Sequence, residues 1–518
     1  MPRYLIAVLF GLMLAWAGWE EMGPPPFAAR VDLVVEPRMP VRFYLRKSGG
    51  LFRIAPVDAA IPIKSDVFYR DHLYRRVPDP RIIEVVATDQ YHYLLTKGMG
   101  TFHLPAGKYK IEAYRGLFYT PGEAEFELQP NETRRVTLRM RPWEGADPSA
   151  WISSDDHIHL TRSKADDPAF LDWLEAEDLT VGNFLALQRQ MDAAPQYAFG
   201  RSGEARRRGY SIRPGQEIRN EFWGHINVLG ASAMIRPMST GLMYANSPES
   251  YPFPSLQFAE GRRLGGLTGY AHFFQKPQRS AIYMDAALGG IDFVEVMQFS
   301  VLKTGPWYEL LNAGLRVTGI AGSDFPVPLN NRRPWPLWLP LLGPERTLVK
   351  ARPGEASYET WAKGVKEGRV VVSNGPLVEL TLDRATGRVE AWAGFFRPLE
   401  SLEIVRNGEV IASVRGDGSR TRLTASVAAE CPQSCWIAAR TQARKLDGEP
   451  EIQAHTNPEY LLRDGKPVRV ESARRAVAAK WEEELAYFRN AGIVFPDDAK
   501  RREFFTAAEK ALAILKAE

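Results

Sequence analysis

The sequence predicts a multi-domain protein in which an α/β domain, expected to form a distorted parallel (β/α) barrel, lies between two β-rich segments. The chain has 518 residues, enough for three or four domains of ordinary size. Strand-like and helix-like segments alternate between residues 146 and 375, which is typical of a parallel sheet covered by helices. On both sides of this region, short strands with alternating apolar and polar residues are predicted.

The segment 30–145 is predicted to be a β-sandwich module. Residues 108–114 alternate polar and apolar side chains after the turn at 104–107, so one face should pack and the other should contact water. Residues 133–140 alternate again, with Val136, Leu138 and Met140 on one face. The pattern favours antiparallel strands and carries no cluster of reactive side chains, so a structural or docking role is expected.

The segment 146–375 carries the strand–helix alternation. Apolar strands are predicted at 293–297 and 315–320, and helices at 168–177 and 307–313. Short strands return at 376–465 as a β-rich module, with a hairpin signal at 406–408.

The last segment, 466–518, is predicted to be a helical tail. One helix is expected from the N-cap Ser472 to Ala491, ending at Gly492, and another after the N-cap Asp497. The second helix carries one apolar stripe, made of Phe504, Ala508, Ala511 and Leu515.

The composition excludes several classes of protein. Apolar residues make up 45% and charged residues 25% of the chain, so it is neither disordered nor a coiled coil. Lys and Arg number 66 against 62 Asp and Glu, a net charge of +4, and we expect no nucleic-acid partner and no membrane contact beyond an export signal. The basic run Arg206-Arg207-Arg208 is interpreted as a solvated loop rather than an anion clamp.

Residues 1–17 are predicted to be a signal peptide. Arg3 precedes an apolar run, and Ala15-Trp16-Ala17 is a small-x-small cleavage pattern. The run is shorter than the roughly 20 residues of a membrane-spanning helix; an uncleaved membrane anchor is the alternative. We therefore expect a secreted or periplasmic protein, in which an oxidised Cys431–Cys435 pair could form.

Four of the eight histidines fall in the α/β segment, at strand ends or beside glycine turns. In the segment 155–159, alternate residues of a strand point to one face, so Asp155, His157 and His159 should project together. Two imidazoles with a carboxylate behind them suit Zn²⁺, Mn²⁺ or Fe²⁺, with Asp155 holding a ring N–H. The alternative is a pair of histidines satisfied by the protein alone.

Further candidate ligands lie along the same segment. Glu217 follows a glycine at a predicted strand start, His225 precedes an apolar strand, His272 closes another, and Asp324 follows Gly322-Ser323. A carboxylate can bridge two metals, which a histidine cannot. In a parallel barrel, functional side chains gather at the carboxyl ends of the strands, so these residues should meet. For Asp324 alone, a helix N-cap is the alternative.

The order of these motifs and the residues in them resemble those of the PHP (polymerase and histidinol phosphatase) metallohydrolase superfamily, and within it those of the CehA/McbA (carbaryl-hydrolase-like) type. The resemblance implies a PHP-type barrel for the central segment. It rests on residues 155–159, 215–218, 224–230, 271–272, 322–324 and 367–376, together with the upstream segment 104–109.

Position by position, the resemblance implies one metal ion held by His157, His159, Glu217 and Asp324, and a second held by His225 and His272 with Glu217 bridging. The sequence departs from the family motifs at two places. Gly182-Asn183-Phe184 stands where the family has Thr-Asp-His, and Pro326 stands where a histidine is often found. Both missing groups would serve a third metal, so at most two ions, Zn, Mn or Fe, are expected.

The predicted function is metal-assisted hydrolysis of an ester, amide or carbamate, with Glu217, Asp324 and Asp155 as catalytic carboxylates. No Gly-x-Ser-x-Gly elbow supports a serine nucleophile. Residues 331–338, rich in Pro, Trp and Arg, are interpreted either as an apolar lid for an aromatic small-molecule substrate or as an ordinary packed loop. A phosphoesterase and a non-catalytic binding protein with structural metal stay open as alternatives.

Overall fold

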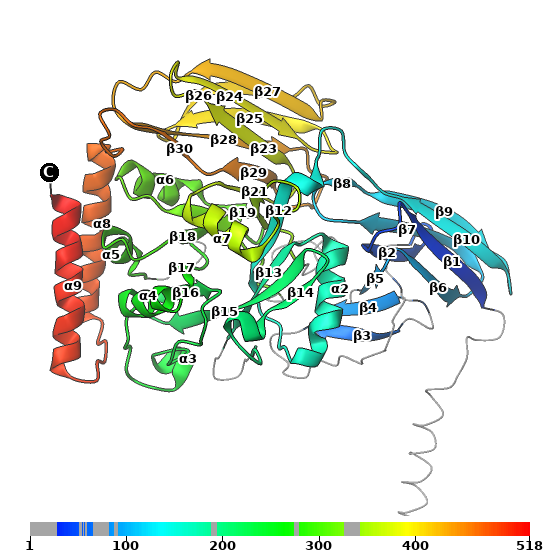
Figure 1. Cartoon of the computed structure of the whole chain (residues 1–518), viewed down its shortest axis with the longest axis horizontal. Helices are drawn as coiled ribbons and strands as arrows, with labels where there is room; N and C mark the ends of the chain where they lie inside the picture. Colours follow the sequence, from blue (N-terminus) through cyan, green and yellow to red (C-terminus); the bar gives the residue numbers. More distant parts are fainter. Residues whose placement is uncertain are drawn as a thin grey trace, which may run out of the picture. The chain divides into compact units, whose positions relative to one another are not determined.

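The computed structural model describes residues 28–50, 54, 56, 60–65, 82–87, 92–187, 194–273, 279–325 and 342–517, with 60–65, 82–87 and 92 described by their backbone alone. The chain divides into two compact units (Figure 1). The smaller comprises Met1–Lys64, Leu73–Tyr114 and Pro121–Met140, and the larger comprises Ser65–His72, Arg115–Thr120 and Arg141–Glu518. The fold is mixed α/β, with several sheets and more strands than helices among the described residues.

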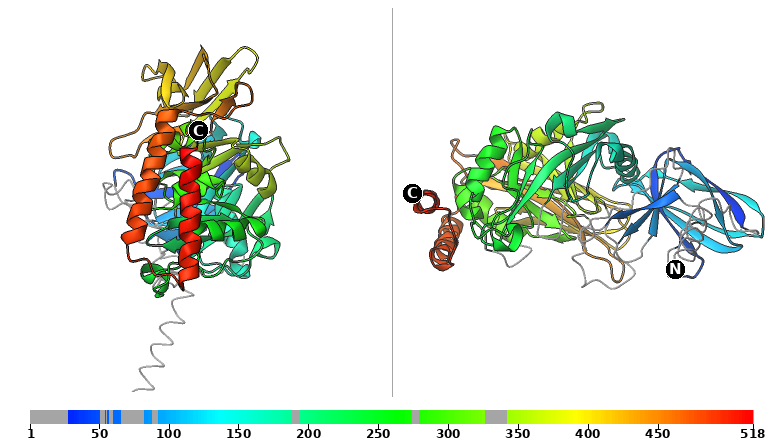
Figure 2. Two further views of the ribbon diagram at one scale, coloured as in Figure 1. Left: turned by 90° about the vertical axis from the view of Figure 1, so that its left-hand side faces the viewer. Right: turned by 90° about the horizontal axis from the view of Figure 1, so that it is seen from below.

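The smaller unit holds two sheets, with strand orders β10-β1-β6 and β3-β4-β5-β2-β7-β9 (blue to cyan in Figures 1 and 2). The strands are β1 (Ala29–Glu36), β2 (Val41–Lys47), β3 (Ala60–Ser65), β4 (Ile82–Ala87), β5 (His92–Thr96), β6 (Met99–Leu104), β7 (Gly107–Tyr114), β9 (Gly122–Leu128) and β10 (Thr133–Arg139).

The alternating pattern predicted for this unit is confirmed. Tyr109, Ile111 and Ala113 of β7 are buried, as are Val136 and Leu138 of β10. The prediction of purely antiparallel strands is wrong, because β1 pairs with β10 in parallel. Parallel pairing needs a long crossover connection, and the intervening strands β2 to β9 supply it.

The larger unit is built on a ring of described strands, each pairing with the next. In order they are β12 (Trp151–Ile158), β13 (Val181–Ala186), β15 (Tyr210–Asn220), β16 (Gly224–Leu229), β17 (Leu267–Tyr270), β18 (Phe293–Gln298) and β20 (Thr318–Ala321). The ring closes just after β20. There the His159 N–H donates to the Phe325 carbonyl at 2.6 Å, and the Phe325 N–H donates to the His157 carbonyl at 3.1 Å.

The prediction of a parallel arrangement is correct for most of the ring and wrong for β16. The strands β12, β13 and β15 run parallel, as do β17, β18 and β20, whereas β16 is antiparallel to both neighbours. Only residues 221–223 separate β15 from β16. A connection this short can join only antiparallel strands.

The sheet continues beyond the ring, because β12 also pairs with β21 and the order then runs β21-β22-β29-β28-β25-β26. It therefore crosses the boundary predicted at residue 375. These strands are β21 (Arg346–Lys350), β22 (Val370–Ser373), β25 (Leu399–Arg406), β26 (Glu409–Arg415), β28 (Cys435–Ala443) and β29 (Ile452–Thr456). A separate sheet contains β23 (Leu377–Leu382), β24 (Arg388–Gly394) and β27 (Arg422–Ala428). The short strands are β8 (Tyr119–Thr120), β11 (Arg141–Pro142), β14 (Ala205–Arg207), β19 (Val301–Leu302) and β30 (Glu459–Leu461).

The described α-helices all belong to the larger unit. They are α2 (Asp167–Glu177), α3 (Leu242–Ala245), α4 (Pro254–Arg263), α5 (Ile282–Ala287), α6 (Thr304–Asn312), α7 (Tyr358–Lys366), α8 (Glu471–Asn490) and α9 (Asp498–Lys516). The helices predicted at 168–177 and 307–313 correspond to α2 and α6. Among the described helices, none combines the length and apolar character needed to cross a membrane.

The helical tail forms two long helices that lie side by side (Figure 2, left). Asp497 caps α9, since its side chain accepts from the Lys500 N–H at 2.8 Å, and the predicted apolar stripe is buried. The prediction of Ser472 as N-cap is wrong. The α8 N-cap is Val470, whose N–H donates to the Asn312 carbonyl at 2.7 Å, and this tertiary contact starts the helix earlier.

Trp223, two residues before a predicted metal ligand, joins the tail to the ring. Its ring lies 4.6 Å from that of Phe504 and 5.1 Å from that of Phe488, measured between centroids. All three side chains are almost fully buried. The tail therefore supports the beginning of β16.

Truncation of Phe504 is expected to destabilise the larger unit. Phe504→Ala removes a fully buried ring and should lower the free energy of unfolding by about 3–5 kcal/mol. The matched control is Phe505→Ala, because the neighbouring ring is only partly buried and should cost clearly less. Chemical denaturation of both variants checks this, and equal losses would contradict the packing described.

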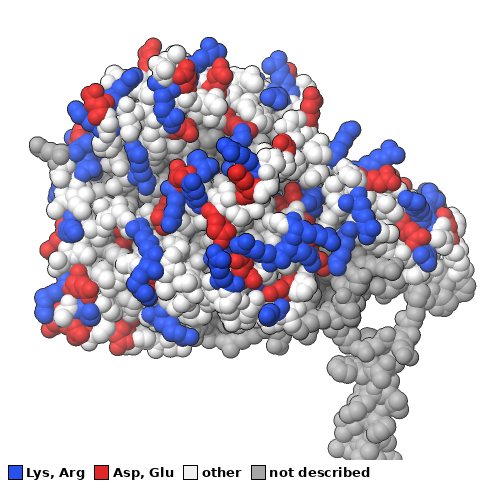
Figure 3. Space-filling model, viewed as in Figure 1, with Lys and Arg blue, Asp and Glu red and all other residues white. Residues whose placement is uncertain are grey.

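The prediction of a solvated loop for Arg206–Arg208 is correct for the turn at Arg208 and for the exposure of Arg206 and Arg208, and wrong for the strand that contains Arg206 and Arg207. Arg206 and Arg207 lie in β14, and they pair with Glu204 and with Asp172 and Glu175 respectively. Acidic neighbours on adjoining segments hold the arginines in the strand. Basic and acidic side chains are likewise interspersed over the face seen in Figure 3.

Cys431 and Cys435 form a disulfide and both are buried, so the pairing considered from sequence is confirmed. The predicted signal peptide (1–17), Pro326 and the Pro- and Trp-rich segment 331–338 lie outside the described residues. The predictions made on them stay predictions.

Candidate metal centre

The ring brings all six predicted ligands to one buried place. His157 and His159 lie at the end of β12, Glu217 lies within β15, His272 follows β17, and Asp324 follows β20. His225 lies near the beginning of β16, in agreement with its predicted place before an apolar strand, whereas Glu217 was predicted at a strand start and lies well inside β15. Since β16 runs antiparallel to its neighbours, its beginning meets the ends of the other strands.

Glu217 occupies the middle of the centre. Its Oε1 lies 3.1 Å from His225 Nδ1 and 3.2 Å from His272 Nε2. Its Oε2 lies 3.2 Å from His159 Nε2 and 3.8 Å from His157 Nε2. Each carboxylate oxygen thus faces a different pair of imidazoles, which is the arrangement of a carboxylate that bridges two metal ions.

His157 and His159 point their Nε2 atoms at one another, 2.9 Å apart. Asp324 Oδ1 lies 3.4 Å from the first and 3.2 Å from the second. Two imidazole nitrogens come this close when they share a proton or bind one cation. Within the described chain, Asp324 Oδ1 and His225 Nδ1 are buried without a hydrogen-bond partner. A buried unpaired polar atom costs about 1–3 kcal/mol, and a metal ion would satisfy both atoms.

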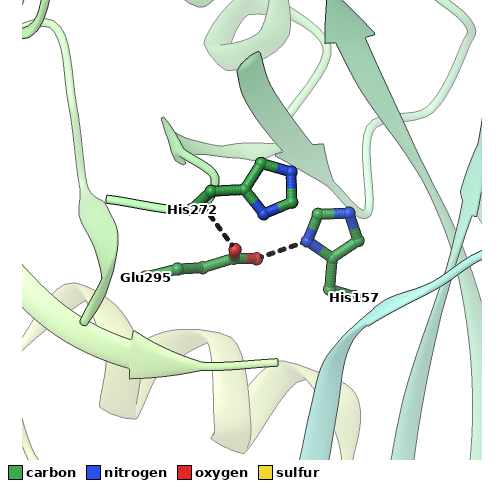
Figure 4. A group of neighbouring side chains, drawn as sticks. All are labelled: His157, His272 and Glu295. Carbon is green, nitrogen blue, oxygen red and sulfur yellow. Dashed lines mark hydrogen bonds and ion pairs between the residues drawn. The ribbon is translucent and has the colours of Figure 1, made fainter. Parts of the chain in front are cut away.

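The protein fixes the far nitrogen of each imidazole. His157 Nδ1 lies 2.8 Å from Glu295 Oε1, and Glu295 Oε2 accepts from the His272 backbone N–H at 2.9 Å (Figure 4). His159 Nδ1 contacts the Leu185 carbonyl at 3.1 Å, and His272 Nδ1 contacts Gln298 Oε1 at 2.6 Å. Acceptors at Nδ1 place the hydrogen there and leave the Nε2 lone pair for a metal.

His225 has the opposite orientation. Its Nε2 lies 3.0 Å from the Tyr244 hydroxyl, and its Nδ1 faces Glu217. Tyr244, on the short helix α3, therefore decides which nitrogen of His225 is available to a metal.

Asp155 lies next to the centre but does not hold a histidine ring, so that prediction is wrong. Its carboxylate accepts from the backbone N–H groups of His157, Ser323 and Gly343. The register of β12 shifts between residues 155 and 158, so strict alternation fails there. Asp155 instead links β12 to the turn that carries Asp324. Asn183 is also buried and donates to Asp156, away from the ligands.

Without a metal ion, protons would neutralise part of the centre. Burial lowers the pKa of the His157 imidazole, but the charges of Glu295 and Asp324 outweigh it, so this pKa is raised well above 6.5. Burial lowers the pKa of His159 as well, but the neighbouring carboxylates of Asp324 and Glu217 outweigh it, so this pKa is also raised. Both histidines are therefore protonated at pH values where a free histidine is already neutral.

Two other candidate ligands, His225 and Glu217, are already in the protonation state that metal binding requires. Burial lowers the pKa of His225 to about 3, so this imidazole is neutral. Burial raises the pKa of Glu217, but the Arg219 charge and the histidines outweigh it and hold the pKa well below 4.5. Glu217 thus remains ionised.

Two ligands have left-handed backbone conformations, with φ of 51° at His272 and 55° at Asp324. Residues other than glycine adopt this region at a cost of about 1–3 kcal/mol, and such strain clusters at functional sites. The hydrogen bonds of Glu295 to the His272 N–H and of Asp155 to the Ser323 N–H hold these turns.

The donor set fits a site for more than one metal ion. Within the described residues, three buried triads have ligand atoms within 4.8 Å of one another: His157-His159-Asp324, Glu217-His225-His272 and His157-His272-Glu295. Imidazole nitrogens and carboxylate oxygens suit Zn²⁺, Mn²⁺ and Fe²⁺. The first two triads match the two ions predicted from sequence, and Glu217 connects them.

The sequence analysis missed Glu295, Arg219 and Tyr244. For Glu295 a signal existed, because a carboxylate in the middle of the apolar strand 293–297 requires a buried partner. Arg219 could have been found from its spacing, since residues two apart on a strand share a face with each other and hence with Glu217. Tyr244 lies on α3, a four-residue helix that is too short for residue spacing to give a signal.

Glu295→Ala should weaken metal binding although Glu295 need not touch the metal. Loss of the carboxylate leaves the hydrogen of His157 free to move to Nε2, and changes of this kind typically cost about 10–100-fold in metal affinity. Competition with a chromogenic chelator measures the affinity. Glu309→Ala, a partly exposed glutamate on α6, is the control and should bind as the unmodified protein does; equal affinity in both variants would contradict the role of Glu295.

Comparisons with known proteins leave the family unassigned. No protein-family model matches the chain, and no curated protein matches it. Among solved structures, it is similar to endonuclease Q in complex with a 27-mer duplex substrate with an abasic lesion, and to the lesion-specific endonuclease PfuEndoQ from Pyrococcus furiosus. Both similarities cover 42% of this chain at 17% identity, with TM-scores of 0.29 and 0.28. They span 57% and 56% of the endonuclease chains, less than two-thirds, and scores this low do not establish a common fold.

Proposed function

We propose that this protein is a metal-dependent hydrolase with a dinuclear centre, of the PHP superfamily and CehA/McbA type. The observation that carries the proposal is the position of Glu217, with each oxygen facing a different pair of histidines. The unpartnered Oδ1 of Asp324 supports it. A decayed site would have lost some of the six ligands.

The proposal divides the six ligands between two positions. His157, His159, Asp324 and Glu217 Oε2 would hold one ion. His225, His272 and Glu217 Oε1 would hold the other. Glu295, Gln298, the Leu185 carbonyl and Tyr244 would keep the imidazoles in the required tautomers.

When bound, the two ions would supply Lewis-acid activation of a water molecule and of the substrate oxygen. Asp324, buried beside His157, His159 and His272, would accept a proton from the attacking water and return it to the leaving group. One water is consumed for each bond broken: its oxygen and one hydrogen remain on the acyl product, and its other hydrogen goes to the leaving group. Asp155 would act by holding the Ser323–Asp324 turn in place.

The substrate class proposed is an ester, amide or carbamate of a small molecule. A phosphoester is the second candidate, favoured by one observation, the guanidinium of Arg219 inside the centre. Export to the periplasm or the medium is also proposed, and the buried Cys431–Cys435 disulfide supports an oxidising compartment.

Chelation and reconstitution test the proposed function. Metal-loaded protein should hydrolyse p-nitrophenyl esters or bis(p-nitrophenyl) phosphate, lose this activity with chelator and regain it with Zn²⁺ or Mn²⁺. His157→Ala should be inactive, whereas His103→Ala, in the smaller unit, should be unaffected. Activity that is indifferent to chelator and to His157→Ala would contradict the proposal. Bound metal without turnover of any chromogen would favour the non-catalytic binding protein.

A further inference from the structure

Arg219 is a buried cation placed inside the acidic and histidine-rich centre. It lies two residues after Glu217 on β15, so the strand directs both side chains to the same face. Its Nε and Nη2 donate to Glu217 Oε2 at 2.7 and 2.6 Å. Only 8% of the side chain is exposed.

The guanidinium has unused hydrogen-bonding capacity. Arginine carries five N–H donors in a planar fork, and two of them are directed at Glu217. Among the described residues, Nη1 of Arg219 has no hydrogen-bond partner. A structural counter-ion for Glu217 needs only the groups already engaged, whereas the remaining donors can bind a ligand.

The guanidinium lies beside the first metal position, because its two contacts are both with Glu217 Oε2. In the register of β15 and β16, Arg219 lies opposite His225. The segment beside it also contributes to the centre, since the Thr240 N–H donates to the Arg219 carbonyl at 3.1 Å and Tyr244 follows shortly after. Leu242 and Met243, which precede Tyr244 on α3, are more than half exposed.

The charge of the loaded centre points to an anionic ligand. Two divalent ions would carry four positive charges and Arg219 one, against the carboxylates of Glu217, Glu295 and Asp324 and that of Asp155 beside them. The loaded centre would keep a surplus of one positive charge in a buried place. A guanidinium fork also matches carboxylate and phosphate oxygens in a bidentate manner, which a neutral ester oxygen cannot exploit.

We propose that Arg219 is a specificity-determining residue that binds an anionic oxygen group of the substrate, so that the centre selects anionic over neutral esters. This inference rests on the proposed dinuclear hydrolase. It narrows the substrate to an ester that carries a carboxylate beside the scissile bond, or to a phosphoester.

A matched substrate series tests the selectivity. Mono-p-nitrophenyl succinate and p-nitrophenyl butyrate share a leaving group and differ in charge, and bis(p-nitrophenyl) phosphate represents phosphoesters. For whichever anionic ester the protein prefers, Arg219→Gln should lower kcat/KM by about 10–100-fold, because one charge-assisted contact is lost. The change should appear mainly in KM. The butyrate should lose clearly less, because Arg219→Gln removes the donors to Glu217 for both substrates but the contact to the substrate anion for only one. The ratio of the two kcat/KM values is therefore the readout. Arg219→Lys should recover part of the loss, and Arg263→Gln, an exposed arginine on α4, should behave as the unmodified protein.

A binding measurement keeps the test independent of turnover. Calorimetry with inorganic phosphate and with succinate on the metal-loaded protein should show binding that Arg219→Gln weakens at least about 10-fold. The metal content and Tm of each variant are measured in parallel with the calorimetry. The inference would be overturned if Arg219→Gln bound both anions as tightly as the unmodified protein, or if kcat/KM fell equally for the succinate and butyrate esters. Arg219 would then be only a counter-ion of Glu217. Failure of the proposed function is distinct, since it would appear as absence of metal-dependent turnover whatever the anion binding.

Discussion

Replacing Glu217 by glutamine is expected to lower kcat for metal-dependent hydrolysis by about 10³-fold or more, the range seen when a charged or polar element of a catalytic centre is removed. Glutamine has nearly the same shape but no negative charge, so it cannot bridge two cations. It also leaves the buried Arg219 without its acidic partner, which Glu217 contacts at 2.6 Å. Steady-state kinetics at saturating Zn²⁺ or Mn²⁺ measure the loss.

Two controls separate a lost bridge from a damaged fold. Glu260→Gln removes an exposed carboxylate of α4 that pairs with Arg263 at the surface, and its kcat should be unchanged. Glu217→Asp keeps the charge on a shorter side chain and should retain more activity than the glutamine variant. Full activity of Glu217→Gln would contradict the bridging role.

Metal binding should stabilise the protein, and the effect should increase with pH. A ligand present at 100 times its dissociation constant adds about 2.7 kcal/mol to the free energy of unfolding. The pKa values of His157 and His159 are raised above the ordinary value in the metal-free centre. The protonated histidines therefore stabilise the metal-free protein fully at low pH, and this contribution is lost as the pH rises through the raised pKa values.

A metal ion must displace these same protons, so its affinity falls as the pH falls. His225, with a pKa of about 3, is already neutral and adds nothing to this dependence. Thermal unfolding with Zn²⁺ and with chelator, at pH values from 6 to 8.5, measures the difference in Tm. We expect the difference to widen with pH. A difference that is constant or narrows would show that protons and metal do not compete at these histidines.

The meeting of four of the candidate ligands could be predicted from sequence because each of the four follows a local rule. His157 and His159 are two apart at the end of a strand, and His272 and Asp324 each close an apolar strand. Strand ends of a parallel arrangement meet at one edge whatever the details of packing. The alternation of β7 and β10 and the stripe of α9 follow the same kind of local periodicity, and the structure confirms them.

The parts that could not be predicted depend on long-range contacts. The irregular register of β12 near Asp155 arises from pairing with β13, and it breaks the alternation that the sequence suggests. The early start of α8 arises from the contact of Val470 with Asn312. Glu295 acts on a histidine 138 residues away, and no spacing within its own strand could identify that partner.

The metal content of the purified protein tests the central claim most directly. Elemental mass spectrometry would be applied to the full-length chain, Glu217→Gln and Glu260→Gln after loading with Zn²⁺ or Mn²⁺ and removal of excess metal. The account predicts two equivalents in the unmodified protein and in Glu260→Gln, and one or none in Glu217→Gln. Two equivalents retained in Glu217→Gln, or none in the unmodified protein, would contradict a dinuclear centre bridged by Glu217.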